Sequence, residues 1–156
     1  MAIASPGATL RDEQQLIGSM VELMKTEQQL LVSADADGLA TLTPNKLRLA
    51  QQAAELSRQR HRALGAAGFV AGEAGMEPWL AVGASDDVRG EWNRLLDLTR
   101  AAKELNRVNG MLLNKQLANT QGILNALRGP ANGAASVYGR GGQTMPAGPS
   151  KRFVVG

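Results

Sequence analysis

This 156-residue chain contains no cysteine, one histidine and few aromatic residues: two tryptophans, two phenylalanines and one tyrosine. The absence of cysteine excludes a disulfide framework and thiolate chemistry, and the single histidine leaves too few ligands for a zinc site. No apolar run approaches the roughly 20 residues that a membrane-spanning helix needs. The first residues, MAIASPGATLRDEQQ, lack the basic-then-apolar order of a secretory signal. We therefore expect a cytoplasmic protein with no membrane insertion, no metal and no other cofactor.

The net charge of +3 arises from the last part of the chain. Residues 1–128 carry 14 basic and 14 acidic side chains, and Arg140, Lys151 and Arg152 supply the surplus. A duplex-binding domain usually gathers its basic residues on one folded face. Acids and bases are interspersed here as far as Glu104, so the first expectation is a protein that binds no nucleic acid. The alternative is a helical adaptor that uses its basic C-terminal half for nucleic-acid binding or regulation.

Two helices are indicated by apolar residues that recur every seven positions. The first stripe contains Leu16, Leu23 and Leu30 beside Ile17, Met24 and Leu31, and the second contains Leu42, Leu49, Leu56 and Ala63. Thr9 can cap the first helix, and acidic residues follow in its first turn. The second helix begins near residue 36, or at Pro44 behind a Thr43 cap. These patterns predict helices over about 9–34 and 36–64, separated by SADADG.

The region after the second helix is rich in glycine. GAAGFVAGEAG has four glycines in eleven residues and predicts an irregular connection. MEPWLAVGA is expected to form one or two helical turns that place Trp79 at an end of the core. A third helix then begins behind a Ser85 cap and runs over about 86–128, with leucines seven apart. It would be about 65 Å long, and Gly129-Pro130 predicts its end.

These segments predict an all-α fold: an antiparallel helical bundle over residues 1–128 with one long C-terminal helix. Residues 129–156 are rich in glycine, proline, alanine and serine and show no apolar period. Such a segment cannot bury enough surface to fold alone, so we expect a disordered Gly-rich tail that carries a docking motif. The seven-residue spacing also suits a coiled coil between copies, so a monomer and a homodimer both stay open.

The residues offer no catalytic constellation. His61 lies among arginines in RQRHRAL, and we interpret it as a solvated side chain on a polar helix face. The acid pairs at residues 12–13 and 86–87 stand at predicted helix starts, where the helix dipole accounts for them. YGRGGQ lacks the strand–turn–helix context and the lysine of a phosphate-binding loop. The chain is therefore expected not to be an enzyme.

Amide side chains recur along the third predicted helix. They are Asn106, Asn109, Asn114, Asn119 and Asn125, with Gln116 and Gln121 between them. One interpretation is that they only face solvent. The other is that they form the rim of a partly apolar groove that accepts the amphipathic helix of another chain. The apolar contacts would then be Met111, Leu112, Leu113, Leu117, Ile123, Leu124 and Leu127.

The stretch ELNRVNGMLLNKQLANTQGILNALRG is followed, after a Gly-rich gap, by YGRGGQT. This order resembles the FlgN-type flagellar export chaperones, whose Asn-rich helix of the pattern N-x-x-N-G-x-L-(I/L) precedes a glycine stop and a Y-G-x-x-G tail. The specific part of the resemblance covers residues 104–144. It implies a cytoplasmic chaperone of type III flagellar secretion that binds the C-terminal helical region of hook–filament junction proteins and prevents their premature assembly.

The resemblance also implies site residues and partners. The client-binding residues would be Asn106, Asn109, Leu112, Leu113, Leu117, Ile123, Leu124 and Leu127. Tyr138 and Gly139 would dock on the cytoplasmic domain of the flagellar export-gate membrane protein, to which the client is delivered. A single tyrosine ring suits such a linear motif because it can bury about 150–250 Å² in a partner's pocket.

Overall fold

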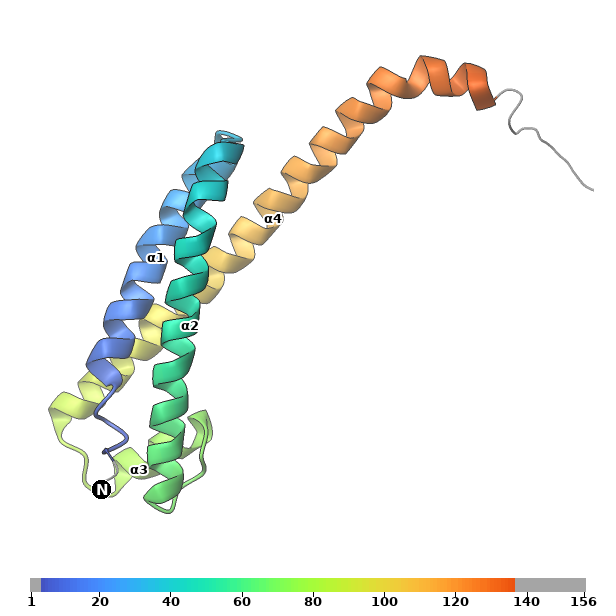
Figure 1. The fold of residues 1–156 in the computed structure, drawn as a ribbon. Helices are drawn as coiled ribbons and strands as arrows, with labels where there is room; N and C mark the ends of the chain where they lie inside the picture. The colour runs from blue at the N-terminus through green and yellow to red at the C-terminus, as the bar shows by residue number, and fades with distance from the viewer. Residues whose placement is uncertain (1–3, 137–156) are drawn as a thin grey trace, which may run out of the picture. The chain divides into compact units, whose positions relative to one another are not determined.

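The computed structural model describes the backbone of residues 4–136 (Figure 1). These residues form the helices α1 (Leu10–Val32), α2 (Ala36–Ala66), α3 (Met76–Ala81) and α4 (Asp86–Ser136), with one 3-10 turn, η1 (Glu73–Gly75). No strand occurs in this part of the chain. The predicted all-α fold with a long C-terminal helix is therefore confirmed. The predicted tail lies outside the described residues from 137 onward.

The chain divides into two compact units between Leu113 and Asn114. The first unit contains α1, α2, η1, α3 and the start of α4, and the second contains the rest of α4. Within the first unit α1 and α2 lie side by side and antiparallel (Figure 1).

A tight turn joins α1 to α2. Ala34 adopts a left-handed φ of 54°, and the Asp35 amide donates a hydrogen bond to the Leu30 carbonyl at 2.9 Å. This arrangement commonly provides hydrogen-bond donors for the last carbonyls of a helix.

At the other end of α1, the Thr9 hydroxyl does not cap the helix as predicted. It donates instead to Glu13 Oε2 at 2.8 Å.

α2 begins at Ala36, so the alternative start at Thr43-Pro44 is wrong. The Asp35 side chain caps the helix by accepting a hydrogen bond from the Gly38 amide at 2.9 Å. Pro44 stands inside the helix and cannot donate to the Ala40 carbonyl. Because Ala40 is exposed, water can bind that carbonyl, and the helix tolerates the proline.

α4 begins as predicted, since Ser85 Oγ accepts a hydrogen bond from the Val88 amide at 3.2 Å. It continues to Ser136, so the predicted end at Gly129-Pro130 is wrong. Proline in a helix removes one hydrogen bond, here to the carbonyl of Ala126. Ala126 is exposed, so this carbonyl can bind water, and the proline weakens the helix without ending it.

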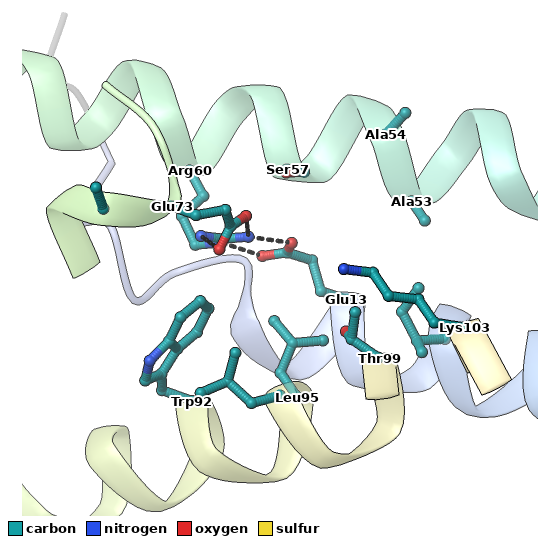
Figure 2. A pocket seen from close by; sticks show the side chains of 13 residues that line it. Glu13, Ala53, Ala54, Ser57, Arg60, Glu73, Trp92, Leu95, Thr99 and Lys103 are labelled. Atoms are coloured by element: carbon teal, nitrogen blue, oxygen red, sulfur yellow. Dashed lines mark hydrogen bonds and ion pairs between the residues drawn. The ribbon is translucent and has the colours of Figure 1, made fainter. Parts of the chain in front are cut away.

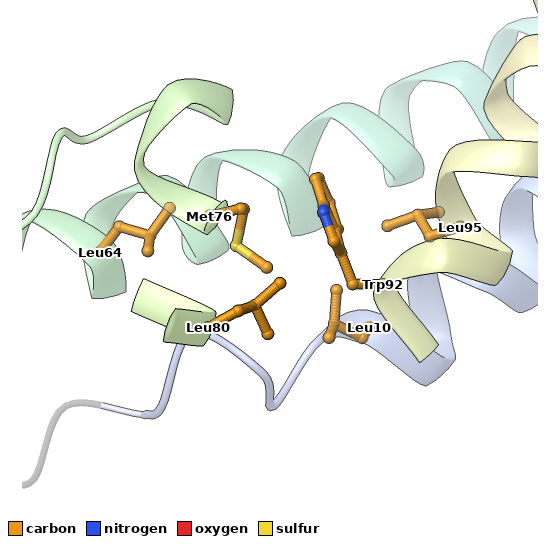
Figure 3. Close-up of a cluster of buried hydrophobic side chains, with 6 residues drawn as sticks. All are labelled: Leu10, Leu64, Met76, Leu80, Trp92 and Leu95. Atoms are coloured by element: carbon orange, nitrogen blue, oxygen red, sulfur yellow. The ribbon is translucent and has the colours of Figure 1, made fainter. Parts of the chain in front are cut away.

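The core of the first unit contains two clusters of buried side chains. The larger comprises Leu10, Leu64, Met76, Leu80, Trp92 and Leu95 (Figure 3). Trp79 packs against its edge, as the sequence predicted. The smaller comprises Met20, Met24 and Leu49, with Leu16 and Leu23 packed against it. The predicted stripes of α1 and α2 therefore face the core, and α3 closes one end of it.

Candidate functional site

The C-terminal part of α4 carries exposed apolar side chains. In the second unit the exposed fractions are 59% for Leu117, 62% for Ile123, 44% for Leu124 and 75% for Leu127. We call these four residues the α4 stripe. Leu117 and Leu124 lie seven residues apart and Leu127 follows three residues later, so these leucines share one helix face. An exposed apolar face of this kind typically marks a protein-binding surface.

Uncharged amides accompany the α4 stripe on the same helix. Asn114, Asn119 and Asn125 are exposed, and Gln121 donates a hydrogen bond to Asn125 Oδ1 at 3.0 Å. No acidic residue follows Glu104 in the sequence. An amide both donates and accepts hydrogen bonds, so this surface can satisfy a partner's polar groups of either kind.

Asn109 does not lie on an exposed rim, and this part of the prediction is wrong. Its side chain is buried in the first unit, with an exposed fraction of 3%. Asn109 Nδ2 donates to the Met24 carbonyl at 2.9 Å and to Glu27 Oε1 at 2.8 Å. The residue ties α4 to α1 because α1 presents two acceptors opposite it. The sequence did not reveal this burial, since it depends on the residues that face Asn109 from another helix.

The remaining predicted client-binding residues of the first unit lie nearer the surface. Asn106 is exposed, and its Oδ1 accepts a hydrogen bond from Lys46 Nζ at 3.2 Å. Lys46 Nζ also pairs with Glu27 Oε1 at 3.0 Å. Leu112 is half-buried, whereas Leu113 is exposed. Tyr138 and Gly139, the predicted export-gate contacts, lie outside the described residues.

Replacing Asn109 with alanine is expected to lower the free energy of unfolding by about 1–2 kcal/mol, because the Met24 carbonyl and Glu27 each lose a buried donor. Asn106→Ala is the matched control. It removes an exposed amide of the same helix and should change stability by less than about 0.5 kcal/mol. Urea denaturation followed by circular dichroism measures both. Equal effects of the two substitutions would contradict the structural role of Asn109.

An ion-pair cluster around the buried Arg60 holds the other end of the first unit together. Arg60 is 3% exposed, and its Nε donates to Glu13 Oε2 at 2.9 Å. Its Nη2 donates to Glu73 Oε1 at 2.8 Å. Figure 2 shows the guanidinium between the two carboxylates, and the Arg60 Cζ atom lies 4.9 Å from the centre of the Trp92 ring. The cluster therefore connects α1, α2, η1 and α4.

Sequence reasoning missed this cluster, although a signal was present. Glu13 precedes Ile17 by four residues and Met20 by seven, so it falls on the apolar stripe of α1. Arg60 falls on the apolar stripe of α2 in the same way, four residues after Leu56. Opposite charges on the core faces of two neighbouring helices indicate a buried pair. Only the tertiary contacts show that the two residues meet.

His61 is not the freely solvated residue that the sequence suggested. Its Nε2 lies 3.0 Å from Glu73 Oε1. Burial alone would raise the pKa of Glu73, but the hydrogen bond and the positive charge of Arg60, assisted by His61, hold this pKa below its ordinary value of 4.5. Burial alone would likewise lower the pKa of the Arg60 guanidinium, but hydrogen bonds and charge pairing with Glu13 and Glu73 raise it above its ordinary value.

The lowered pKa of Glu73 makes the stability of the first unit depend on pH. A carboxylate with a depressed pKa stabilises the folded state fully above its unfolded pKa, here near 4.5. This contribution is lost as the pH falls from that value through the lower, folded pKa. We expect the urea midpoint of the wild type to exceed that of Glu73→Gln at pH 7, and the difference to shrink between about pH 5 and pH 3. A difference that is constant over this range would show that Glu73 does not stabilise through its charge.

The described residues contain no group of three or more His, Asp or Glu side chains that could hold a metal ion. Within residues 4–136 every helix is too short or too polar to cross a bilayer.

The fold and the candidate site together describe an all-α protein with an exposed apolar helix face. This is the construction of a helical protein that binds other proteins.

Comparison with known proteins agrees with this class. A family model described as FlgN protein matches residues 1–146. The chain therefore belongs to the FlgN family and is a flagellar export chaperone. The match includes both the first unit and the α4 stripe. No curated protein and no solved structure matches the chain.

Proposed function

We propose that this chaperone binds the C-terminal helical region of hook–filament junction proteins on the α4 stripe and prevents their premature assembly. The observation that carries the proposal is the exposure of Leu117, Ile123, Leu124 and Leu127 on one helix. Burial of each such side chain contributes about 1.5–3 kcal/mol. Part of this free energy is offset by the ordering of the client, so the complex can be specific and still release its client.

The neighbouring polar residues extend the proposal. The exposed amides of α4 would bind polar groups at the edge of the client helix. Asn106, Leu112 and Leu113, at the end of the first unit, are further proposed contacts. Asn109 is not, because its amide is buried between α4 and α1. We propose that binding takes place in the cytoplasm, before export, and involves the free chaperone as a monomer or a homodimer.

Calorimetric titration tests this function. The full chain is titrated with a hook–filament junction protein, and separately with the same protein lacking its C-terminal helix. We expect binding to the intact client and none to the truncated one. Equal binding to both would show that the C-terminal helix is not the recognised element, and binding to neither would overturn the proposal.

A parallel titration with duplex DNA and with RNA at two salt concentrations tests the alternative of a nucleic-acid-binding adaptor. For such an adaptor the affinity should fall steeply with salt.

Delivery to the export gate is proposed to use Tyr138 and Gly139. We expect Tyr138→Ala to reduce binding to the cytoplasmic domain of the export-gate membrane protein by about tenfold or more, since loss of a well-packed aromatic contact costs more than 1 kcal/mol. The same variant should bind the junction protein as the wild type does. Unchanged binding to the export-gate domain would assign delivery to other residues.

A further inference from the structure

A second apolar surface lies within the first unit. Two adjoining cavities of about 670 and 530 Å³ lie between α2 and α4, and both are lined by Ile17, Thr99 and Lys103. The shared residues show that the cavities form one continuous depression, which we call the α2–α4 groove. Figure 2 shows the larger part, with Ala53 of α2 on one side of it and Thr99 of α4 on the other. The buried side chains of Met20 and Met24 lie at the base of the smaller part.

The groove has the length and width of a helix. On α2 its lining begins at Thr43 and ends at the buried Arg60, about 26 Å along the helix axis, and the stretch from Thr43 to Ser57 spans about 21 Å or four turns. The wall residues between them include alanines at 50, 53 and 54, and Ala102 stands on α4. Small side chains on both walls let another helix approach closely, because the distance between packed helices depends on the side chains at their contact.

The chemistry of the smaller part favours an apolar and acidic occupant. Its floor is formed by Ile17 and two methionines, whose flexible thioethers adapt to different partner side chains. Leu47 stands at its edge and is 58% exposed. Among the residues that the structure describes, Lys46 and Lys103 are the only charged ones that line this part. Lys46 is paired with Glu27, whereas Lys103 has no ion-pair partner within the described residues.

We propose that the α2–α4 groove binds an amphipathic helix of another protein, about four turns long, with carboxylates beside its apolar face at the end that contacts Lys46 and Lys103. Charge argues against two other occupants. The charged side chains of the segment KRFVVG are both basic, and the α4 stripe of a second copy is accompanied by Lys115 and Arg128 with no acidic residue. Either segment would bring cations to Lys103. This proposal is independent of client binding on the α4 stripe.

A designed peptide pair tests the groove with the full chain. Both peptides are amphipathic helices of about 16 residues, roughly 24 Å long, with the same leucine face. One carries glutamate beside this face and the other carries lysine. Fluorescence anisotropy should show that the glutamate peptide binds at least about tenfold more tightly. Lys103→Glu should weaken its binding about three- to fivefold, as expected for an exposed charge pair. Lys115→Glu, the matched control outside the groove, should leave binding unchanged.

Two substitutions of other lining residues test the groove apart from Lys103. Ala50→Trp fills the groove from its wall, and Leu47→Asp places a charge on its edge. Both positions are exposed, so the fold should persist, and circular dichroism verifies this. Each substitution should weaken the glutamate peptide at least about tenfold. Leu124→Asp, on the α4 stripe, should leave the peptide bound.

Several results would overturn the proposal. One is equal binding of the two peptides, or binding that neither groove substitution affects. Loss of binding through Leu124→Asp alone would place the peptide on the α4 stripe. Binding that appears only after removal of residues 137–156 would identify this chain's own C-terminal segment as the occupant. A dimer in sedimentation velocity that Ala50→Trp dissociates would identify a second copy as the occupant.

Discussion

Replacing Arg60 with methionine is expected to lower the free energy of unfolding by about 3–5 kcal/mol. Arg60 is 3% exposed and is held by the Glu13 and Glu73 carboxylates. Without the guanidinium, the buried Glu13 carboxylate keeps the Thr9 hydroxyl as its one hydrogen-bond donor among residues 4–136. Methionine fills much of the volume of arginine, so the loss is mainly electrostatic. Urea denaturation followed by far-ultraviolet circular dichroism measures the change.

Two further variants make this result specific. In Glu13→Met with Arg60→Met no buried charge is left unpaired, and we expect this double variant to recover more than half of the lost stability. Arg62→Met is the matched control, because Arg62 is exposed and pairs with Glu55 at the surface. It should change stability by less than about 1 kcal/mol. An Arg60→Met variant as stable as the control would show that the cluster does not stabilise the first unit.

The second large effect is expected in client binding. Leu117→Asp and Leu124→Asp should each weaken the junction-protein complex about thirtyfold, since loss of a central apolar contact costs about 2 kcal/mol. The double variant should weaken it more than about a hundredfold. Both leucines are exposed in the free protein, so the free energy of unfolding should change by less than about 0.5 kcal/mol. Calorimetric titration with the junction protein and urea denaturation measure the two quantities.

Ala118→Asp is the matched control for these variants. Ala118 is exposed, and it lies about 100° around the helix from Leu117 and about 120° or more from the other members of the α4 stripe. The substitution introduces the same carboxylate on the same helix, and client affinity should stay within about twofold of the wild type. Loss of binding in the control would indicate a general effect of negative charge on α4. Intact binding in both leucine variants would remove the α4 stripe as the client surface.

The helices themselves could be predicted because their causes are local. The predicted helix over 9–34 is observed as Leu10–Val32, and that over 36–64 as Ala36–Ala66. Apolar spacing, Asp35 at one helix start and Ser85 at another are features of neighbouring residues, and helical hydrogen bonds join residues only four apart. The two errors at helix boundaries, Pro44 and Gly129-Pro130, have a common cause. Proline removes one hydrogen bond, and an exposed carbonyl can replace it with water.

Only the tertiary structure decided which polar side chains are buried. The sequence placed Asn109 on a solvent-facing or rim position and assigned no role to Arg60, and both are buried because partners on other elements face them. The α2–α4 groove likewise depends on where three helices lie, and no spacing within one helix reveals it. The sequence alone was sufficient for the all-α fold, the helix positions and the family, since these follow from local patterns. The ion-pair cluster around Arg60, the role of Asn109 and the groove required the fold, because burial and charge pairing are properties of residues brought together from distant parts of the chain.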